Sequence, residues 1–379
     1  MSTVKLGDVA IESRDSLKEK DKSLPVVGLE HLIPEQINLT DWNIGQENTF
    51  TKTFKKGDVL FGRRRAYLKK AAVAPCKGIC SGDITVIRAK EDKIIPELLP
   101  FVIQNDIFFD YAVGKSAGSL SPRVKWEHLA NYEFNLPELD EQKKLAEVLW
   151  QIVATMESYK KLLAKSDEMV KAKFVEMFGD PVANPKKWEI KTVKSISSDI
   201  RYGTSKPSNE NGKYIYLRMN NITSEGELDL KDIKYIDADD VELEKCSVRK
   251  GDILFNRTNS LELVGKTCVY KEEYPMIIAG YIIRIRLYDF VNPIWFSIYF
   301  NTKYMKKVLR TLAKGAINQA NISATELQQI ELYIPPIELQ NQFADFVKKS
   351  EESKAAIQAS LDSLTKVYKK IIAENLGGR

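Results

Sequence analysis

Clustered arginines and lysines are the side chains of this sequence with the clearest chemical use. Arg63, Arg64 and Arg65 are consecutive, and Lys69 and Lys70 follow closely. A guanidinium group can donate two hydrogen bonds to a planar pair of acceptors, such as the edge of guanine, whereas a lysine ammonium suits a phosphate. This cluster therefore favours binding to a nucleic acid.

Further polar and cationic candidates lie in two loops and near other turns. The small-residue segment 114–122 and the segment 314–322 each follow a predicted helix. Asparagine can pair bidentately with adenine, which makes exposed asparagines candidates as well. The candidates outside the arginine cluster are Lys115, Ser119, Arg123, Lys125, Arg201, Tyr202, Lys206, Arg218, Asn220, Asn221, Arg257, Asn259, Lys314, Asn318, Gln319 and Asn321. Any one of them could instead be a solvated surface residue.

Motifs for catalysis are incomplete in this sequence. Glu141-x-Lys143 could mimic part of a nuclease motif, but acidic residues are ordinary at the start of a helix. Gly114-Lys115-Ser116 resembles the end of a phosphate-binding loop, yet Phe109 stands where the upstream glycine belongs. Neither G-x-G-x-x-G nor an Asn/Asp-Pro-Pro-aromatic motif occurs. We therefore expect that this chain is not an enzyme.

Metal-binding and targeting signals are also weak. Cys76 and Cys80 form a single C-x3-C, whereas a zinc site needs a second pair of ligands. We interpret the four cysteines as reduced thiols in a cytoplasmic protein. The N-terminal segment lacks the apolar core of a signal peptide, and no apolar run approaches the roughly 20 residues that cross a bilayer. We expect no metal, no cofactor and no membrane partner for this chain.

The length and charge of the chain set broad limits. Its 379 residues suffice for two domains of ordinary size, and a hydrophobic fraction of 44% with 29% charged residues is typical of a globular protein. The net charge of +5 and the isoelectric point near 8.7 permit nucleic-acid binding without requiring it.

An internal duplication is the strongest pattern. Three segments return in the same order: 5–10 at 192–197, 55–61 at 249–255, and 128–149 at 326–347. The offset is 194 between Gly57 and Gly251, and 198 between Pro137 and Pro335. A period near 200 residues is too long for a solenoid, so it predicts two domains of similar fold.

Each half is expected to be α+β. Alternating branched and polar residues predict strands at 59–74, 83–89, 251–257, 266–271 and 281–288. One helix per half is predicted, at 96–106 and at 293–312, and a last strand ends near Pro137 or Pro335.

A long helix follows each of these prolines. Its apolar positions are spaced alternately by four and three, which is the coiled-coil period of 3.5. The seam residues are Leu145, Leu149, Ile152, Met156, Tyr159, Leu163, Val170 and Met177 in the first helix, and Phe343, Val347, Ile357, Leu361, Leu364, Tyr368 and Ile371 in the second.

We expect the two helices to pack on each other as an antiparallel coiled coil, which would give the chain a pseudo-two-fold axis. The alternative is two independent amphipathic helices, each lying on its own domain. The predicted boundaries are 1–137 and 180–336 for the domains, and 138–179 and 337–379 for the helices with their linker.

At this point the sequence resembles the DNA-specificity subunits of type I restriction–modification systems, over essentially its whole length. The motifs that carry the resemblance are Gly57-Asp58, Gly251-Asp252, Leu136-Pro137 with Glu141-Gln142, Ile334-Pro335-Pro336 with Leu339-Gln340, and the linker from Phe174 to Pro181. In the second copy Leu339 replaces the glutamate that precedes glutamine.

The resemblance implies two target-recognition domains, each reading one half of a bipartite, asymmetric site in double-stranded DNA. The coiled coil would set the gap between the halves and dock two methyltransferase subunits. Restriction and motor subunits can complete such a complex. S-adenosylmethionine, ATP and magnesium are expected on those partner subunits.

Two other classes of function stay open. One is a structural scaffold whose domains bind proteins, and the other is a free-standing nuclease or methyltransferase, which the missing motifs disfavour. On the DNA-binding hypothesis, the change from Arg63-Arg64-Arg65 to Arg257-Thr258-Asn259 is part of why the two halves recognise different sequences.

Overall fold

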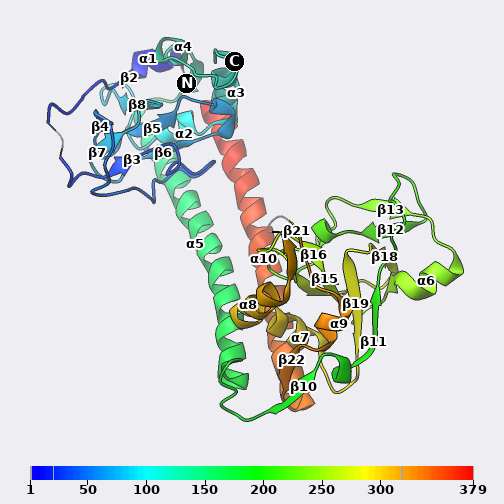
Figure 1. Ribbon diagram of the computed structural model, residues 1–379. Coiled ribbons are helices and arrows are strands. Elements are labelled where there is room, and N and C mark those ends of the chain that lie inside the picture. Colours follow the sequence, from blue (N-terminus) through cyan, green and yellow to red (C-terminus); the bar gives the residue numbers. More distant parts are fainter. Residues whose placement is uncertain (1, 20, 317–318, 379) are drawn as a thin grey trace. The chain divides into compact units, whose positions relative to one another are not determined.

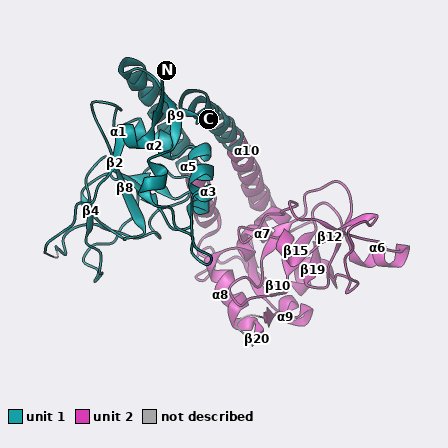
Figure 2. Cartoon of the chain, turned by 90° about the horizontal axis from the view of Figure 1, so that it is seen from above, with its two compact units in different colours: residues 1–162, 357–379 teal, residues 163–356 magenta. Residues whose placement is uncertain are grey.

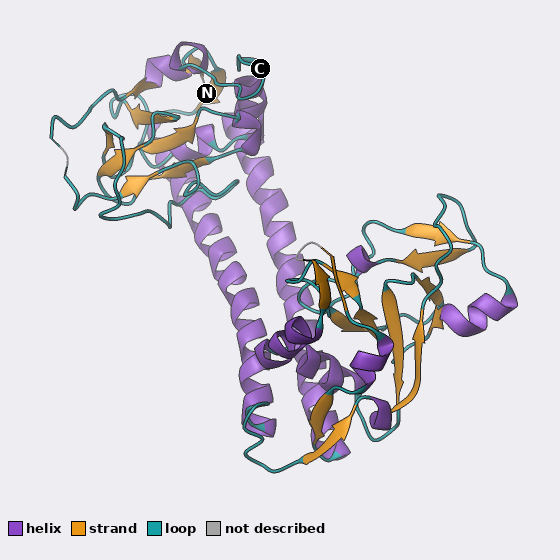
Figure 3. Cartoon of the chain, viewed as in Figure 1, coloured by secondary structure: helices purple, strands orange, loops and turns teal. Residues whose placement is uncertain are grey.

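The computed structural model describes residues 2–19, 21–316 and 319–378 (Figure 1). The chain divides into two compact units, residues 1–162 with 357–379 (unit 1) and residues 163–356 (unit 2), which Figure 2 colours separately. Both units mix helices and strands (Figure 3), as the expected α+β class requires.

Unit 1 is built around a four-stranded antiparallel sheet in the order β2-β8-β5-β6. Its strands are β2 (Ala10–Glu12), β8 (Ile84–Ala89), β5 (Val59–Gly62) and β6 (Ala71–Val73). A second sheet joins β3 (Val26–Val27), β7 (Gly78–Cys80) and β4 (Lys52–Phe54), and a third pairs β1 (Ser2–Lys5) with β9 (Glu133–Leu136). The helices are α1 (Leu6–Val9), α2 (Leu99–Ile103), α3 (Asp106–Gly114) and α4 (Trp126–Leu129), with a 3-10 turn at Ala66–Leu68.

Unit 2 repeats this plan. Its main sheet, in the order β11-β19-β15-β17, contains β11 (Ser197–Tyr202), β19 (Ile282–Leu287), β15 (Ile253–Asn256) and β17 (Thr267–Val269). The other strands are β13 (Lys234–Ile236), β12 (Tyr214–Leu217), β18 (Met276–Ile278) and β14 (Ser247–Val248) in one sheet, β16 (Thr258–Asn259), β21 (Gln319–Asn321) and β20 (Lys314–Ala316) in another, and the pair β10 (Glu189–Thr192) and β22 (Glu331–Ile334). Helices α6 (Asp240–Cys246), α7 (Pro293–Phe300), α8 (Lys303–Leu312) and α9 (Ala324–Gln328) and 3-10 turns at Lys194–Ile196 and Met219–Asn221 complete it.

The repeated Gly-Asp pair has a structural role in both units. Gly57 and Gly251 have φ angles of 89° and 90°, a region that glycine adopts without steric cost. The aspartate that follows is buried and accepts hydrogen bonds from the guanidinium group of an arginine on the neighbouring strand. Asp58 lies 2.7 Å from Nε of Arg88, and the carboxylate of Asp252 lies 3.0 Å from Nε of its arginine, Arg286. The motif therefore fixes the entry into β5 and β15.

A buried glutamine anchors the start of each long helix. Nε2 of Gln142 donates to the carbonyl oxygen of Pro137, and its Oε1 accepts from the amide of Ile95. In unit 2, Gln340 makes the same two bonds, to Pro335 and to the amide of Asn292. This explains why glutamine recurs in the motif, whereas the preceding Glu141 is exposed and its counterpart varies.

Two helices of 40 residues follow these anchors, α5 (Leu139–Phe178) and α10 (Ile337–Leu376), with bounds that differ by 198 at both ends. Every seam position predicted from the sequence is buried or half-buried. In unit 1 the first part of α5 shares a hydrophobic core with the last part of α10. In unit 2 the last part of α5 packs on the first part of α10, where the rings of Phe174 and Phe343 lie 5.6 Å apart.

The predicted strands are confirmed in position, but each half has two helices where one was expected. The segment 96–106 contains α2, and a second helix, α3, begins only at its last residue because Asn105 caps α3, its side chain accepting from the amide of Ile107. The segment 293–312 divides into α7 and α8, and Thr302 caps α8 in the same way. The segment 314–322, expected as a loop, carries the strands β20 and β21. In both units a capping side chain starts a new helix within an apolar stretch, and the sequence pattern did not predict this boundary.

Candidate nucleic-acid interface

The structure of unit 1 brings two of the sequence-predicted clusters together. Strand β5 continues into Arg63, whose amide donates to the carbonyl oxygen of Asp83 at 3.0 Å. The carbonyl oxygen of Arg63 accepts from the amide of Val124, also at 3.0 Å. These ladder-like bonds place the arginine cluster directly beside the loop that carries Ser119 and Arg123.

One aspartate organises the cations of this cluster. Asp83 accepts two hydrogen bonds from Arg123, at 2.7 and 3.2 Å, and lies 3.7 Å from a guanidinium nitrogen of Arg64. The hydrogen bond from Arg123 lowers the pKa of Asp83. Arg64 also donates to the hydroxyl of Ser121 at 3.0 Å. Since one carboxylate faces several arginines, the site keeps a positive charge.

The arginine side chains themselves are only partly satisfied. The Nε atoms of Arg63 and Arg64 are buried and have no hydrogen-bond partner among the described residues. Arg65 is exposed, with a φ of 55°, and begins a 3-10 turn. A buried donor without a partner costs free energy, so these groups would gain from an acceptor supplied by a ligand.

Several other candidates of unit 1 already have partners. Lys69 forms an ion pair of 2.5 Å with Asp106, and Lys70 donates to the carbonyl oxygen of Leu29 at 2.7 Å. Both lysines therefore help to hold the fold and are less available to a phosphate than the sequence suggested. Lys115 lies 5.6 Å from the centre of its neighbouring tyrosine ring, whereas Ser119 and Lys125 are exposed.

Unit 2 carries an arginine at the equivalent place. Arg257 donates its amide to the carbonyl oxygen of Tyr281 and accepts from the amide of Ile322, both at 2.9 Å. These bonds match those of Arg63, and the Nε of Arg257 is also buried, with no hydrogen-bond partner in the part of the chain that the structure describes. The guanidinium lies 4.9 Å from the ring centre of Tyr202, a stacked geometry that holds the arginine in place.

The β16–β21–β20 sheet occupies the position of the unit 1 loop. Thr258 pairs with Asn321 in the backbone register, and their side chains hydrogen-bond at 3.3 Å. Asn259 accepts from the amide of Ser260, and Gln319 is exposed. Asn318, another predicted contact residue, lies outside the described residues.

The remaining sequence-predicted cations of unit 2, four in number, are ion-paired. Their partners are Asp199 for Arg201, Glu242 for Lys206, Asp232 for Arg218 and Glu326 for Lys314. The hydrogen bond from Lys314 lowers the pKa of Glu326 to about 2. All four cations except Arg218 are exposed, so ion pairing does not remove them from a ligand's reach, and Asn220 is exposed too.

The prediction for Asn221 is wrong. This side chain is buried, donates to the carbonyl oxygens of Asp229 and Asp232, and accepts from the amide of Arg218. Its amide group is fully used in closing a turn, so it is not free to pair with a base. The neighbouring Asn220 is the accessible asparagine of this turn.

Asp83 was not recognised from the sequence as a site residue. The only available signal was the Gly82-Asp83 pair, which precedes a strand as the two recurring Gly-Asp pairs do. A carboxylate in a cationic site is hard to foresee because its arginine partner lies forty positions away in the sequence.

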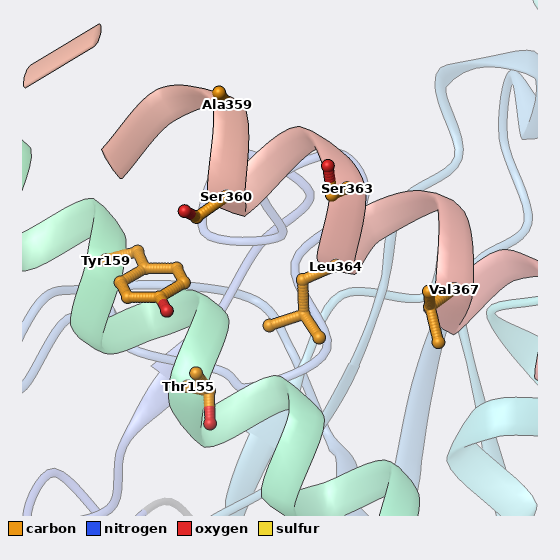
Figure 4. A pocket seen from close by; sticks show the side chains of 7 residues that line it. All are labelled: Thr155, Tyr159, Ala359, Ser360, Ser363, Leu364 and Val367. Carbon is orange, nitrogen blue, oxygen red and sulfur yellow. The ribbon is translucent and has the colours of Figure 1, made fainter. Parts of the chain in front are cut away.

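The open groove found in unit 1 lies elsewhere, between α5 and α10. Thr155 and Tyr159 line it from α5, and Ala359, Ser363 and Leu364 are among the residues of α10 that face it. Figure 4 shows Leu364 pointing from α10 toward α5. Within the described part of the chain there is no group of three side chains suited to hold a metal ion, and no helix that could span a membrane.

The fold and the two sites define a class: a duplicated protein whose α+β domains each present an arginine at the end of the same strand. Residues 1–165 and 185–366 match the family described as the type I restriction modification DNA specificity domain. The chain therefore belongs to this family, that of the specificity subunits of type I restriction–modification systems.

Two curated relatives are similar to this chain. The putative type I restriction enzyme MjaX specificity subunit of Methanocaldococcus jannaschii is 27% identical over 189 residues, which cover 49% of this chain and 44% of that protein. The type I restriction enzyme EcoKI specificity subunit of Escherichia coli K12 is 23% identical over 355 residues, 88% of this chain and 76% of that protein. The chain thus aligns with less than half of the archaeal relative.

Solved structures share the fold. The type I restriction–modification S subunit from M. genitalium has a TM-score of 0.60 at 13% identity, covering 99% of this chain and 96% of that one. A chain from a study of complex assembly and conformational transition of the type I R-M system has a TM-score of 0.58 at 20% identity, covering 99% and 97%.

Proposed function

We propose that this chain is the non-catalytic DNA-specificity subunit of a type I restriction–modification complex, in which each unit recognises one half of a bipartite, asymmetric site. The observation that carries the proposal is the matched pair Arg63 and Arg257. Both follow the Gly-Asp strand and both bond to the same later segment of their unit. Both also have a buried Nε that finds no partner among the described residues. Family membership supports DNA as the ligand.

The two halves are proposed to read different bases because their side chains diverge at matched positions. Arg64 and Arg65 correspond to Thr258 and Asn259. Arginine favours the acceptors of guanine, whereas asparagine favours adenine. Contacts between basic side chains and DNA phosphates would add affinity in both halves, but they would not distinguish one base sequence from another.

The helices α5 and α10 are proposed to form an antiparallel coiled coil that sets the unread gap between the half-sites and gives the chain a pseudo-two-fold axis. Support comes from the equal length of the two helices, from the offset of 198 residues between their bounds, and from the buried or half-buried seam positions. The same helices would dock two methyltransferase subunits.

Chemistry is assigned to the partner subunits of the cytoplasmic complex. The methyltransferase subunits would bring S-adenosylmethionine, and the restriction and motor subunits would bring ATP and magnesium. The names of the relatives describe specificity subunits of restriction enzymes, which supports the same role here.

The test is a triple substitution, Arg63→Ala, Arg64→Ala and Arg65→Ala, in the full chain assembled with its methyltransferase partner. Methylation-site sequencing in a host carrying the system first identifies the target. Loss of affinity for that target, with a smaller dependence of binding on salt, is the expected result. The matched control replaces Lys18, Lys22 and Lys77, cations of the same unit on other loops. Unchanged affinity and salt dependence in the triple variant would overturn the assignment.

A further inference from the structure

Helix α8 of unit 2 presents a row of cations that the function proposed above does not use. Lys303, Lys307 and Arg310 are exposed and recur at intervals of four and three, which places them on one face of the helix. None of the three forms an ion pair with a carboxylate of the described residues. At 1.5 Å per residue the row is roughly 10 Å long.

The equivalent helix of unit 1 has the opposite charge. Asn105 caps α3 as Thr302 caps α8, and the buried Phe108 and Ala112 correspond to Met305 and Leu309. This alignment sets Asp106 and Asp110 of α3 against Lys303 and Lys307 of α8. The duplication has therefore kept the helix and its packing while reversing the charge of its exposed face.

An ion pair of α3 has no possible equivalent on α8. In unit 1, Asp106 binds Lys69, the residue before Lys70. The amide of Gly62 bonds to Lys70 as the amide of Asn256 bonds to Lys266, so the counterpart of Lys69 is Gly265. Where α3 uses an acidic residue to hold the fold, α8 carries exposed cations that form no ion pair with the described residues.

Two further lysines reinforce the positive field beneath this face. Nζ of Lys306 donates to the carbonyl oxygen of Gly265 at 2.8 Å, and Nζ of the buried Lys266 donates to that of Met219 at 2.9 Å. Burial and the charges of Lys266 and Arg310 lower the pKa of Lys306 to about 8. An anion on this surface would relieve that repulsion.

The row adjoins the candidate site of unit 2. The amide of Gly265 donates to the carbonyl oxygen of Asn256, the residue before Arg257, and α8 itself leads into β20. We propose that Lys303, Lys307 and Arg310 bind the phosphate backbone of the DNA duplex whose bases lie at the site around Arg257. This inference rests on the proposed DNA-binding function and adds a unit-specific clamp on the backbone, with no counterpart on α3.

The experiment exchanges the charges for those of unit 1, in Lys303→Asp with Lys307→Asp, in the full chain assembled with its methyltransferase partner. Asp is tolerated at both positions of α3, and an acidic residue at the start of a helix is favourable, so the melting temperature should stay level or rise. Binding is measured against salt for the methylated target and for a mixed-sequence duplex.

We expect the affinities for both duplexes to fall by the same factor, roughly tenfold or more, and the slope of log K against log salt to drop by about 2, because phosphate contacts carry no sequence information. The matched control, Lys194→Asp with Lys245→Asp, changes two exposed lysines of the same unit and should leave the slope nearly unaltered.

Two results would overturn the inference. Equal slopes in the exchange variant and the wild type would show that α8 does not touch phosphates. Loss of assembly with the methyltransferase, with DNA binding otherwise intact, would identify an acidic protein surface as the occupant. Failure of the proposed function is a separate result, since the wild-type complex would then show no salt-dependent binding to either duplex.

Discussion

At the scale of single residues, buried polar side chains hold the fold at the places where the sequence repeats. Gln142 and Gln340 make the same bonds to a proline carbonyl and to a backbone amide, and Asp58 and Asp252 bind matching arginines. These contacts explain why the glutamine and the aspartate recur in both copies of the motifs. The recurring glutamine and aspartate of these motifs are therefore explained by the fold itself.

Replacing Gln142 with leucine should destabilise unit 1 by about 1–3 kcal/mol, because it leaves the amide of Ile95 and the carbonyl of Pro137 without their partners. Chemical denaturation would measure the loss. The neighbouring Glu141→Gln, at an exposed position, is the control and should change stability by less than about 0.5 kcal/mol. Equal stability of the two variants would contradict the anchoring role.

Lys306 should give unit 2 a distinctive dependence of stability on pH. The pKa of its ammonium is lowered to about 8 in the folded chain from 10.5, mainly by burial. Between these values the unfolded chain holds more protons, so stability rises as pH increases through this window. Denaturation at several pH values should show that Lys306→Met lacks the rise and that the exposed Lys307→Met keeps it. If stability depends on pH with the same slope in both variants, Lys306 is not the source of the rise.

At the scale of elements, the unit 1 loop from Ser116 to Lys125 depends on Asp83 for its position. Asp83→Ala should release Arg123 and Arg64 and speed amide hydrogen exchange in the loop, by roughly tenfold if about 1.4 kcal/mol of local stability is lost. Asp92→Ala, at an exposed carboxylate of the same unit, should leave the exchange unchanged.

Acid should lower the protection factors of the loop amides, which are exchange rates corrected for the intrinsic rate at each pH, as the Asp83 substitution does. The pKa of Asp83 is lowered from 3.8 by the hydrogen bond from Arg123, so its contribution is complete above that value and is lost as pH falls below it. If the protection factors of the loop amides stay constant down to the lowest pH at which the chain is folded, Asp83 does not organise the loop.

Sequence patterns predicted the long helices and the strands of the main sheets because both depend on local periodicity. They also predicted that Arg63 and Arg257 directly follow a recurring strand, as the structure has it, whereas the contact of these arginines with DNA stays a prediction. They failed where distant contacts decide. The ion pair between Lys69 and Asp106 and the buried amide of Asn221 arise from segments that meet only in the folded chain. The second helix of this region, α3, was missed because it begins at a single capping asparagine, Asn105, within an apolar run.

At the scale of the whole molecule, the proposed spacer role of α5 and α10 can be tested by length. Deleting one heptad from each helix, residues 160–166 and 358–364, removes about 10.5 Å while keeping the register of the seam. The preferred gap between half-sites should shorten by about three base pairs at 3.4 Å each, as read by methylation-site sequencing. Deletion from one helix only is the control and should abolish binding, because the helices then differ in length by one heptad and their two ends no longer both pack as in the intact chain. If the double deletion leaves the preferred gap between the half-sites unaltered, the two helices do not set its length.

Each domain is closed by a pairing of its first and last strands. Ser2 faces Leu136 in the β1–β9 pair, and Glu189 faces Ile334 in the β10–β22 pair. The points at which a domain joins the rest of the chain are therefore neighbours. A gene could therefore inherit a different domain by exchanging everything between the two paired strands. The junction, the bond from the buried glutamine to its proline and the helix register would be kept, and the new domain would need only to supply a backbone amide in place of that of Ile95 or Asn292.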